Sequence, residues 1–121
     1  MNIIGKFKNG TITISNLKSE DKLHFNFDIN ISTPNISYTY HFGESVYFSM
    51  YDFIDRKQEK LCDEDAMDNY LEITKECFGI IINQEEVSSN LKLNFDIWED
   101  QDKLIDFLIE LKATCEVLLE Q

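Results

Sequence analysis

The sequence is poor in the residues that interrupt or cross-link a chain. It has one proline and four glycines in 121 residues, so long disordered segments are not expected, and the scattered glycines form no phosphate-binding loop. Its three cysteines, Cys62, Cys77 and Cys115, include no C-x-x-C pair. This number and spacing predict neither a disulfide framework nor a zinc site, and they fit a reducing compartment.

Long apolar runs and an excess of basic residues are also missing. No stretch approaches the roughly 18 apolar residues of a membrane span, and no N-terminal apolar segment resembles a signal peptide. We therefore expect a cytoplasmic protein without a membrane partner. The chain carries 11 basic and 23 acidic side chains, a formal net charge of −12. This balance argues against nucleic acid as a partner, because the phosphate backbone would be repelled.

What the sequence does contain is a series of alternating stretches in its first half. Asn9-Gly10 is typical of a type I′ hairpin turn, which would pair Lys8 with Thr11. This pairing places on one face Ile3, Phe7, Ile12 and Ile14. Residues 22–31 and 35–42 alternate in the same way and predict two further strands.

Residues 46–51 allow two assignments. The pair Gly43-Glu44 resembles a two-residue hairpin loop, and the aromatic run after it favours a fifth strand. A helix that begins at Ser45 is the alternative, and both interpretations stay open at this point.

The second half changes to a helical period. Residues 64–78 follow an acidic first turn and precede Gly79, and residues 100–119 carry an apolar stripe from Leu104 to Leu119. We predict a helix over each range, with a short strand over 80–82 and a half-exposed strand over 91–98 between them. The apolar residues that suggest the first helix are Met67, Tyr70, Leu71, Thr74 and Phe78.

Together these elements predict one α+β domain over residues 1–121. We expect an antiparallel sheet of five to seven strands that begins as an N-terminal meander, with two main helices packed on one face. The predicted core consists of Leu23, Phe25, Phe27, Tyr38, Tyr40, Leu93, Phe95, Leu104, Leu108 and Leu111.

The two histidines are the first candidates for chemistry. His24 and His41 are predicted on the polar face of adjacent strands, either opposite each other or with His41 opposite Asn26. Facing histidines could bind a metal, but that face offers few further ligands, so we interpret both as exposed strand residues.

The carboxylates give no stronger indication of a site. Asp63-x-Asp65-x-x-Asp68 resembles the start of a calcium loop, yet Asp68 occupies the position where that loop needs glycine. No G-x-S-x-G turn or nucleotide-binding motif is present. We therefore predict that the chain is not an enzyme and uses no cofactor and no metal.

The distribution of charge is the most informative feature. Residues 1–50 carry four basic and four acidic side chains, whereas residues 51–121 carry seven and nineteen. This asymmetry is typical either of a plain solvated surface or of a surface that meets a basic protein partner. For the second case, Trp98 is the expected aromatic anchor. The predicted partner-binding residues are Asp63, Glu64, Asp65, Asp68, Glu72, Trp98, Glu99, Asp100, Asp102 and Asp106.

In size, charge and fold class the chain resembles the immunity proteins that neutralise bacterial toxins. Such toxins are often basic nucleases, so the resemblance implies an acidic inhibitor that binds a cognate toxin. No sequence motif carries this resemblance. The alternatives are an acidic secretion chaperone, a nucleic-acid mimic, or a small ligand-binding domain or hydrolase with a pocket between sheet and helices.

Overall fold

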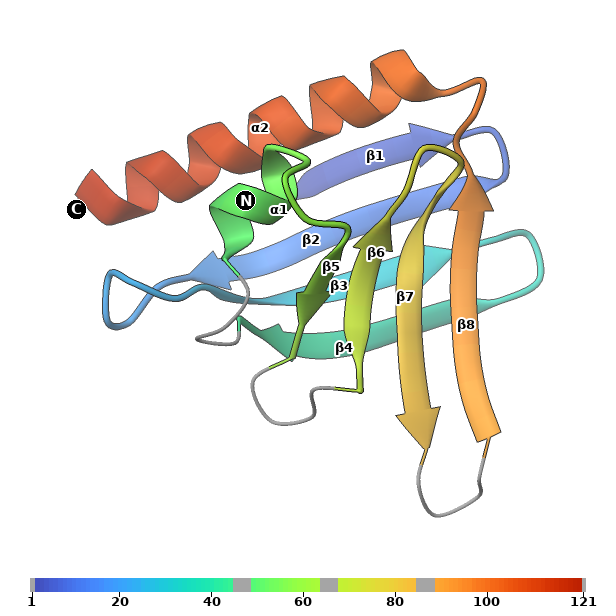
Figure 1. Ribbon diagram of the computed structural model, residues 1–121, viewed down its shortest axis with the longest axis horizontal. Coiled ribbons are helices and arrows are strands. Elements are labelled where there is room, and N and C mark those ends of the chain that lie inside the picture. Colours follow the sequence, from blue (N-terminus) through green and yellow to red (C-terminus); the bar gives the residue numbers. More distant parts are fainter. Residues whose placement is uncertain (1, 45–48, 64–67, 85–88, 121) are drawn as a thin grey trace.

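The chain begins with a four-stranded antiparallel meander. The computed structural model describes residues 2–44, 49–63, 68–84 and 89–120 (Figure 1). The strands of the meander are β1 (Ile3–Phe7), β2 (Gly10–Lys18), β3 (Asn26–Ser32) and β4 (Ser37–Gly43), and each pairs with the next one along the chain. Neighbouring antiparallel strands need only short connections, and those after β1 and β3 are two and four residues long.

The remaining strands form a second antiparallel sheet in the same manner. They are β5 (Lys60–Cys62), β6 (Tyr70–Ile73), β7 (Cys77–Gln84) and β8 (Ser89–Asp96), again paired in chain order. The helix α1 (Met50–Ile54) lies between the two sheets in sequence, and α2 (Gln101–Glu120) follows the last strand. The α+β class, the antiparallel pairing and the N-terminal meander are confirmed. The strands are divided between two sheets, whereas the sequence predicted one.

The core lies where the two sheets and α2 meet. Figure 1 shows the strands of the second sheet crossing those of the first, with α2 along β1. Phe78 of β7 connects all three parts, because its ring lies 6.1 Å from that of Phe7 on β1 and 5.7 Å from that of Phe107 on α2. A Cβ atom at Gly5 would come within 2.7 Å of Phe7 and 3.0 Å of Phe107, so this close approach requires glycine.

A polar junction joins the two sheets at one corner. Glu44 and Asp63 form an isolated antiparallel bridge between the end of β4 and the end of β5. Asp63 is buried, and its carboxylate accepts hydrogen bonds from the Tyr40 hydroxyl and, at 3.2 Å, from the Gly43 N–H. Asn69 donates to the Tyr40 oxygen at 3.0 Å. These bonds satisfy a carboxylate that burial would otherwise destabilise.

The helix predicted over residues 64–78 is wrong wherever the structure describes it. Tyr70–Ile73 and Cys77 onward are strands, joined by a tight turn in which the Thr74 N–H donates to the Cys77 carbonyl at 2.8 Å. The apolar stripe omitted Ile73, which is buried together with Leu71 in the alternating pattern of a strand. Residues 64–67 lie outside the described part of the chain.

The first hairpin keeps the predicted face but not the predicted register. Phe7 pairs with Gly10, so Lys8 and Asn9 form the turn, and neither Asn9 nor Gly10 has positive φ as a type I′ turn requires. The observed register is shifted by two residues relative to the predicted one. Because side chains alternate along a strand with a period of two, a shift by two residues leaves each side chain on the predicted face of the sheet. The four apolar residues expected on one face are all buried: Ile3, Phe7, Ile12 and Ile14.

The second hairpin places the histidines apart. His41 lies opposite Asp28, not opposite His24 or Asn26, and its Nδ1 lies 2.8 Å from an Asp28 carboxylate oxygen. His24 lies before β3, where its Nδ1 is 2.7 Å from Asp21. Both predicted registers are therefore wrong, because the connection consists of residues 33–36 and lies later in the chain than either register assumed.

The region around residue 50 is helical. Ser49 caps α1, since its side chain accepts from the Asp52 N–H at 3.4 Å. The end of the predicted fifth strand, Met50-Tyr51, is therefore wrong, while residues 46–48 of that prediction lie outside the described residues.

Most of the predicted core is buried. The exception is Leu23, which is 74% exposed in the connection before β3. Tyr38 and Tyr40 are partly buried, and the Phe95 side chain is not described. The predicted core residues that are buried are Phe25, Phe27, Leu93, Leu104, Leu108 and Leu111. None of the helices in the described part is long and apolar enough to cross a membrane.

Candidate partner-binding site

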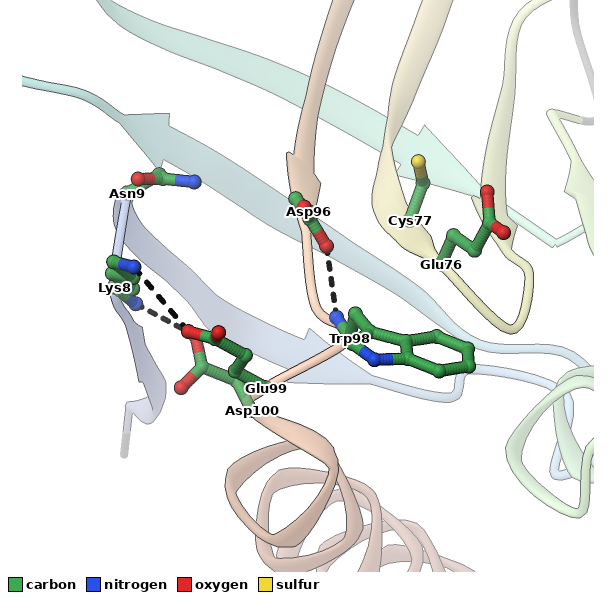
Figure 2. Close-up of a pocket in the computed structure, with 8 residues that line it drawn as sticks. All are labelled: Lys8, Asn9, Glu76, Cys77, Asp96, Trp98, Glu99 and Asp100. Carbon is green, nitrogen blue, oxygen red and sulfur yellow. Dashed lines mark hydrogen bonds and ion pairs between the residues drawn. The ribbon is translucent and has the colours of Figure 1, made fainter.

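One cleft, here named the main cleft, lies where the first hairpin, the second sheet and the start of α2 meet. It has a volume of about 470 Å³, and Figure 2 shows the side chains around it. The residues that line it are Lys8, Asn9, Glu76, Cys77, Asp96, Trp98, Glu99 and Asp100. A volume in this range is typical of sites that hold a small molecule or one side chain of a partner.

Backbone pairing brings the two main walls of the cleft together. Cys77 at the start of β7 lies opposite Asp96 at the end of β8, and the Ile97 N–H donates to the Glu76 carbonyl at 2.7 Å. The side-chain amide of Gln101 extends this contact by donating to the carbonyl oxygens of Lys75 at 3.1 Å and Ile97 at 3.0 Å. The turn before β7 is thereby held against the segment that enters α2.

Asp100 fixes the first hairpin to the beginning of α2. It is only 7% exposed, and its carboxylate accepts from the Lys8 backbone N–H at 2.8 Å and lies 3.6 Å from the Lys103 ammonium. Its carbonyl accepts the first helical bond, from the Leu104 N–H at 3.0 Å. A carboxylate at this position also interacts favourably with the positive end of the helix dipole. Asp100 is thus already satisfied within the chain.

Trp98 is the exposed aromatic group of the site. Its side chain is 66% exposed although its backbone is fixed, because the Trp98 N–H donates to the Asp96 carboxylate at 2.9 Å. Figure 2 shows the indole extending from the β8–α2 connection toward the side on which Glu76 and Cys77 lie, with Lys8 and Asn9 on the other side. A large aromatic residue held in this way is available for contact with another molecule.

The charge of the cleft is predominantly negative. Its lining includes four carboxylates and one ammonium group, that of Lys8. This ammonium lies 3.3 Å from the Glu99 carboxylate, and both side chains are about 70% exposed (69% and 73%). An ion pair so exposed to water is weak. The site therefore attracts cations despite its own lysine.

Some of the predicted site residues come together here and others do not. Trp98, Glu99 and Asp100 line the cleft, and Asp102 and Asp106 lie exposed on the first turns of α2. Five of the ten predicted residues thus lie in the segment 98–106, which includes the start of α2.

The earlier acidic cluster is separate. Asp68 is exposed and Glu72 half-buried, at β6 and the residues before it, whereas Asp63 is buried at the junction of the sheets and cannot face a partner. Glu64 and Asp65 lie outside the described residues.

Sequence reasoning missed five lining residues. They are Lys8, Asn9, Glu76, Cys77 and Asp96. The correct register of the first hairpin would have identified the first two as turn residues. The others depend on the pairing of β7 with β8, which the predicted helix over 64–78 concealed.

A second, smaller cleft of about 230 Å³ lies beside Glu44 and includes Asp21 and His24. Hydrogen bonds from His24 and from the backbone N–H groups of His24 and Leu23 hold the pKa of Asp21 well below its usual range. Burial raises the pKa of Glu44, which accepts from the Met50 N–H at 3.0 Å and from the Phe25 N–H at 3.4 Å. Both carboxylates therefore accept hydrogen bonds from the chain's own backbone N–H groups.

Among the described residues, the main cleft contains neither a cluster of metal ligands nor a histidine. Within residues 2–44, 49–63, 68–84 and 89–120, no group of three or more histidine, cysteine, aspartate or glutamate side chains could hold a metal ion. Neither histidine lines the main cleft, so its half-buried Cys77 has no imidazole beside it. The absence of enzymatic activity stays a prediction.

Comparison with known proteins identifies no relative. No protein-family model, no curated protein and no solved structure matches this chain. Its function is therefore inferred from its own residues.

Proposed function

We propose that this chain acts by binding a basic protein partner through the surface around Trp98. The observation that carries the proposal is an indole that is 66% exposed, beside a cleft with four carboxylates in its lining. Interface hot spots combine a rigid aromatic anchor with a charged surrounding that guides the partner. The cleft supplies the anchor, and the exposed Glu99, Asp102 and Asp106 extend the charge along α2.

The form of this function that fits best is an immunity protein. A small acidic α+β protein that acts in the bacterial cytoplasm would neutralise a toxin made by the same cell. Where the toxin is a basic nuclease, an acidic inhibitor covers the positive surface that would otherwise hold nucleic acid. The net charge of −12 suits such a target.

Co-expression with the product of the adjacent gene tests the proposal. We expect a stable complex that suppresses the toxicity of that product, and we expect Trp98→Ala to weaken binding about tenfold or more. The matched control is Ile36→Ala. Ile36 is also exposed (49%), but it lies within residues 1–50, whose basic and acidic side chains are equal in number. Equal affinity of the wild type and Trp98→Ala, or an equal loss with Ile36→Ala, would contradict a site at Trp98.

The volume of the same cleft favours one other candidate, a small-molecule binding domain. A space of about 470 Å³ is large enough for a metabolite-sized ligand. Such a protein would bind a small cation without any protein partner, and thermal-shift screening of the purified chain would detect it. The exposed position of Trp98 favours the protein partner, because small-ligand sites usually enclose their aromatic groups.

A further inference from the structure

Two carboxylates of the main cleft have no cation of their own. In the part of the chain that the structure describes, the Glu76 carboxylate makes no hydrogen bond or ion pair, and the Asp96 carboxylate accepts only from the Trp98 backbone N–H at 2.9 Å. By contrast, Glu99 is near Lys8, and Asp100 is near Lys103 and the Lys8 N–H. Among the four carboxylates of the cleft, only Glu76 and Asp96 thus have no cation of a described residue beside them.

The exposed indole lines the same cleft. Figure 2 shows the Trp98 ring on the side of the cleft where Glu76 lies, with the Asp96 carboxylate next to the Trp98 backbone N–H. The face of an indole attracts cations, and tryptophan does so more strongly than tyrosine or phenylalanine. A cation that stacks on Trp98 therefore lies in the same cleft as the two carboxylates that have no cation beside them.

The geometry suits guanidinium better than ammonium. A guanidinium group is planar, so it stacks on an aromatic ring while its N–H groups point outward in the plane toward carboxylates. An ammonium group is compact and strongly hydrated, and gains less from a flat face. The cleft volume of about 470 Å³ leaves room for the aliphatic part of the side chain as well.

We propose that the cleft receives an arginine side chain of the partner protein, stacked on Trp98 and hydrogen-bonded to Glu76 and Asp96. This inference depends on the proposed function, since it names the group by which the partner is recognised. Lys8 has the opposite effect in this arrangement. Its ammonium, 3.3 Å from Glu99, repels an incoming cation and reduces the affinity.

A titration without any partner protein tests this site directly. The probe is the peptide acetyl-Gly-Arg-Gly-amide at low ionic strength, compared with the same peptides carrying lysine or citrulline, the neutral analogue of arginine. Trp98 is the only tryptophan of the chain, so its fluorescence reports on this cleft. We expect a saturable change with arginine in the millimolar range, a weaker one with lysine and none with citrulline.

Charge-neutral variants then locate the contact. Glu76→Gln together with Asp96→Asn should weaken arginine binding about three- to tenfold, and the amide introduced by the second substitution keeps an oxygen that accepts from the Trp98 N–H. Lys8→Gln should strengthen binding, because it removes a repelling charge and leaves the backbone bond to Asp100 intact. The matched control is Glu110→Gln, an exposed carboxylate beyond the second turn of α2.

The outcomes separate this inference from the proposed function. Equal binding of the citrulline or the lysine peptide, or an equal loss with Glu110→Gln, would overturn the arginine site. If the partner protein still required Trp98 in that case, the proposed function would stand. If the arginine peptide bound as expected but no basic protein did, the site would stand as a guanidinium site and the protein-binding function would fall.

Discussion

The hydroxyl group of Tyr40, on the first sheet, is hydrogen-bonded to a carboxylate next to the second sheet. It donates to Asp63 and accepts from the Asn69 amide at 3.0 Å. Burial, followed by the bond to Asp63, raises the pKa of Tyr40 to about 12, so the hydroxyl remains protonated and keeps donating at any ordinary pH. The junction of the sheets thus depends on the buried Asp63 carboxylate, to which few hydrogen-bond donors are available.

Removing this hydroxyl should destabilise the fold measurably. We expect Tyr40→Phe to lower the free energy of unfolding by about 1–3 kcal/mol, because the buried Asp63 loses its side-chain donor. The matched control is Tyr38→Phe, on the same strand and also partly buried, whose hydroxyl makes no hydrogen bond to any described residue. Urea denaturation of both variants measures the difference. Equal losses would show that the junction does not depend on this bond.

Glu44 is the other buried carboxylate at this corner. It is 4% exposed, and burial raises its pKa above the ordinary value of 4.5 even though two backbone N–H groups donate to it. Because the folded state prefers the protonated form, the contribution of Glu44 to stability is fully present below pH 4.5 and is lost as the pH rises through the raised pKa.

A neutral variant should remove this dependence on pH. Relative to the wild type, Glu44→Gln should gain stability as the pH increases from 4 to 7, by about 1.4 kcal/mol for each unit by which the folded pKa exceeds the unfolded one. Comparing melting temperatures at each pH cancels the opposite effect of other carboxylates, such as Asp21 and Asp28, whose pKa values are lowered. The control is Glu20→Gln, an exposed residue of the same cleft. A difference that stays constant with pH would refute this account of Glu44.

At the scale of elements, α2 stabilises the fold through one face only. Leu108 is 6% exposed and packs in the core, whereas the next residue, Ile109, is 63% exposed. We expect Leu108→Ala to cost about 2–5 kcal/mol in unfolding free energy. Ile109→Ala should change it by less than about 0.5 kcal/mol, since alanine is also the better helix former. Similar losses at both positions, measured by urea denaturation, would mean that the outer face of α2 is covered.

The same helix shows what a sequence can predict. Its 20 residues, Gln101–Glu120, repeat the apolar spacing over several turns, and no strand pattern competes over such a length. The β6–β7 region is shorter and carries both periods at once. There the β-branched Ile73 and the turn at Thr74 favour strands, but the apolar residues at helical spacing conceal this pattern until the pairing of β7 with β6 and β8 is known.

The candidate site was predictable only in part, for the same reason. The exposure of Trp98 follows from its polar position next to a strand, and Glu99 and Asp100 follow it directly in sequence. Glu76 and Lys8 reach the cleft through strand register, from positions far away in the chain. A difference of two residues in register preserves a buried face, yet it changes which residues occupy a turn.

At the scale of the whole molecule, the acidic half of the sequence becomes the second sheet and the helices. Residues 51–121 carry nineteen acidic side chains against seven basic ones, while the first half is balanced. The acids of this half are spread over several elements. Glu99, Asp102 and Asp106 lie exposed at or just before the start of α2, and Asp68 lies exposed just before β6. Of these four, Glu99 lines the cleft together with the exposed Trp98.

This arrangement makes opposite predictions for the two rates of partner binding. Long-range attraction should accelerate association at low salt and fade as the Debye length falls from about 30 Å at 0.01 M to about 8 Å at 0.15 M. The double variant Asp102→Asn/Asp106→Asn should therefore mainly slow association, because both side chains lie exposed on α2 outside the cleft. Trp98→Ala should mainly accelerate dissociation, because short-range packing is lost only after the complex has formed. Stopped-flow measurements across this salt range separate the two effects. The proposed roles would be wrong if the association rate did not depend on salt concentration. They would also be wrong if Trp98→Ala changed the association rate alone.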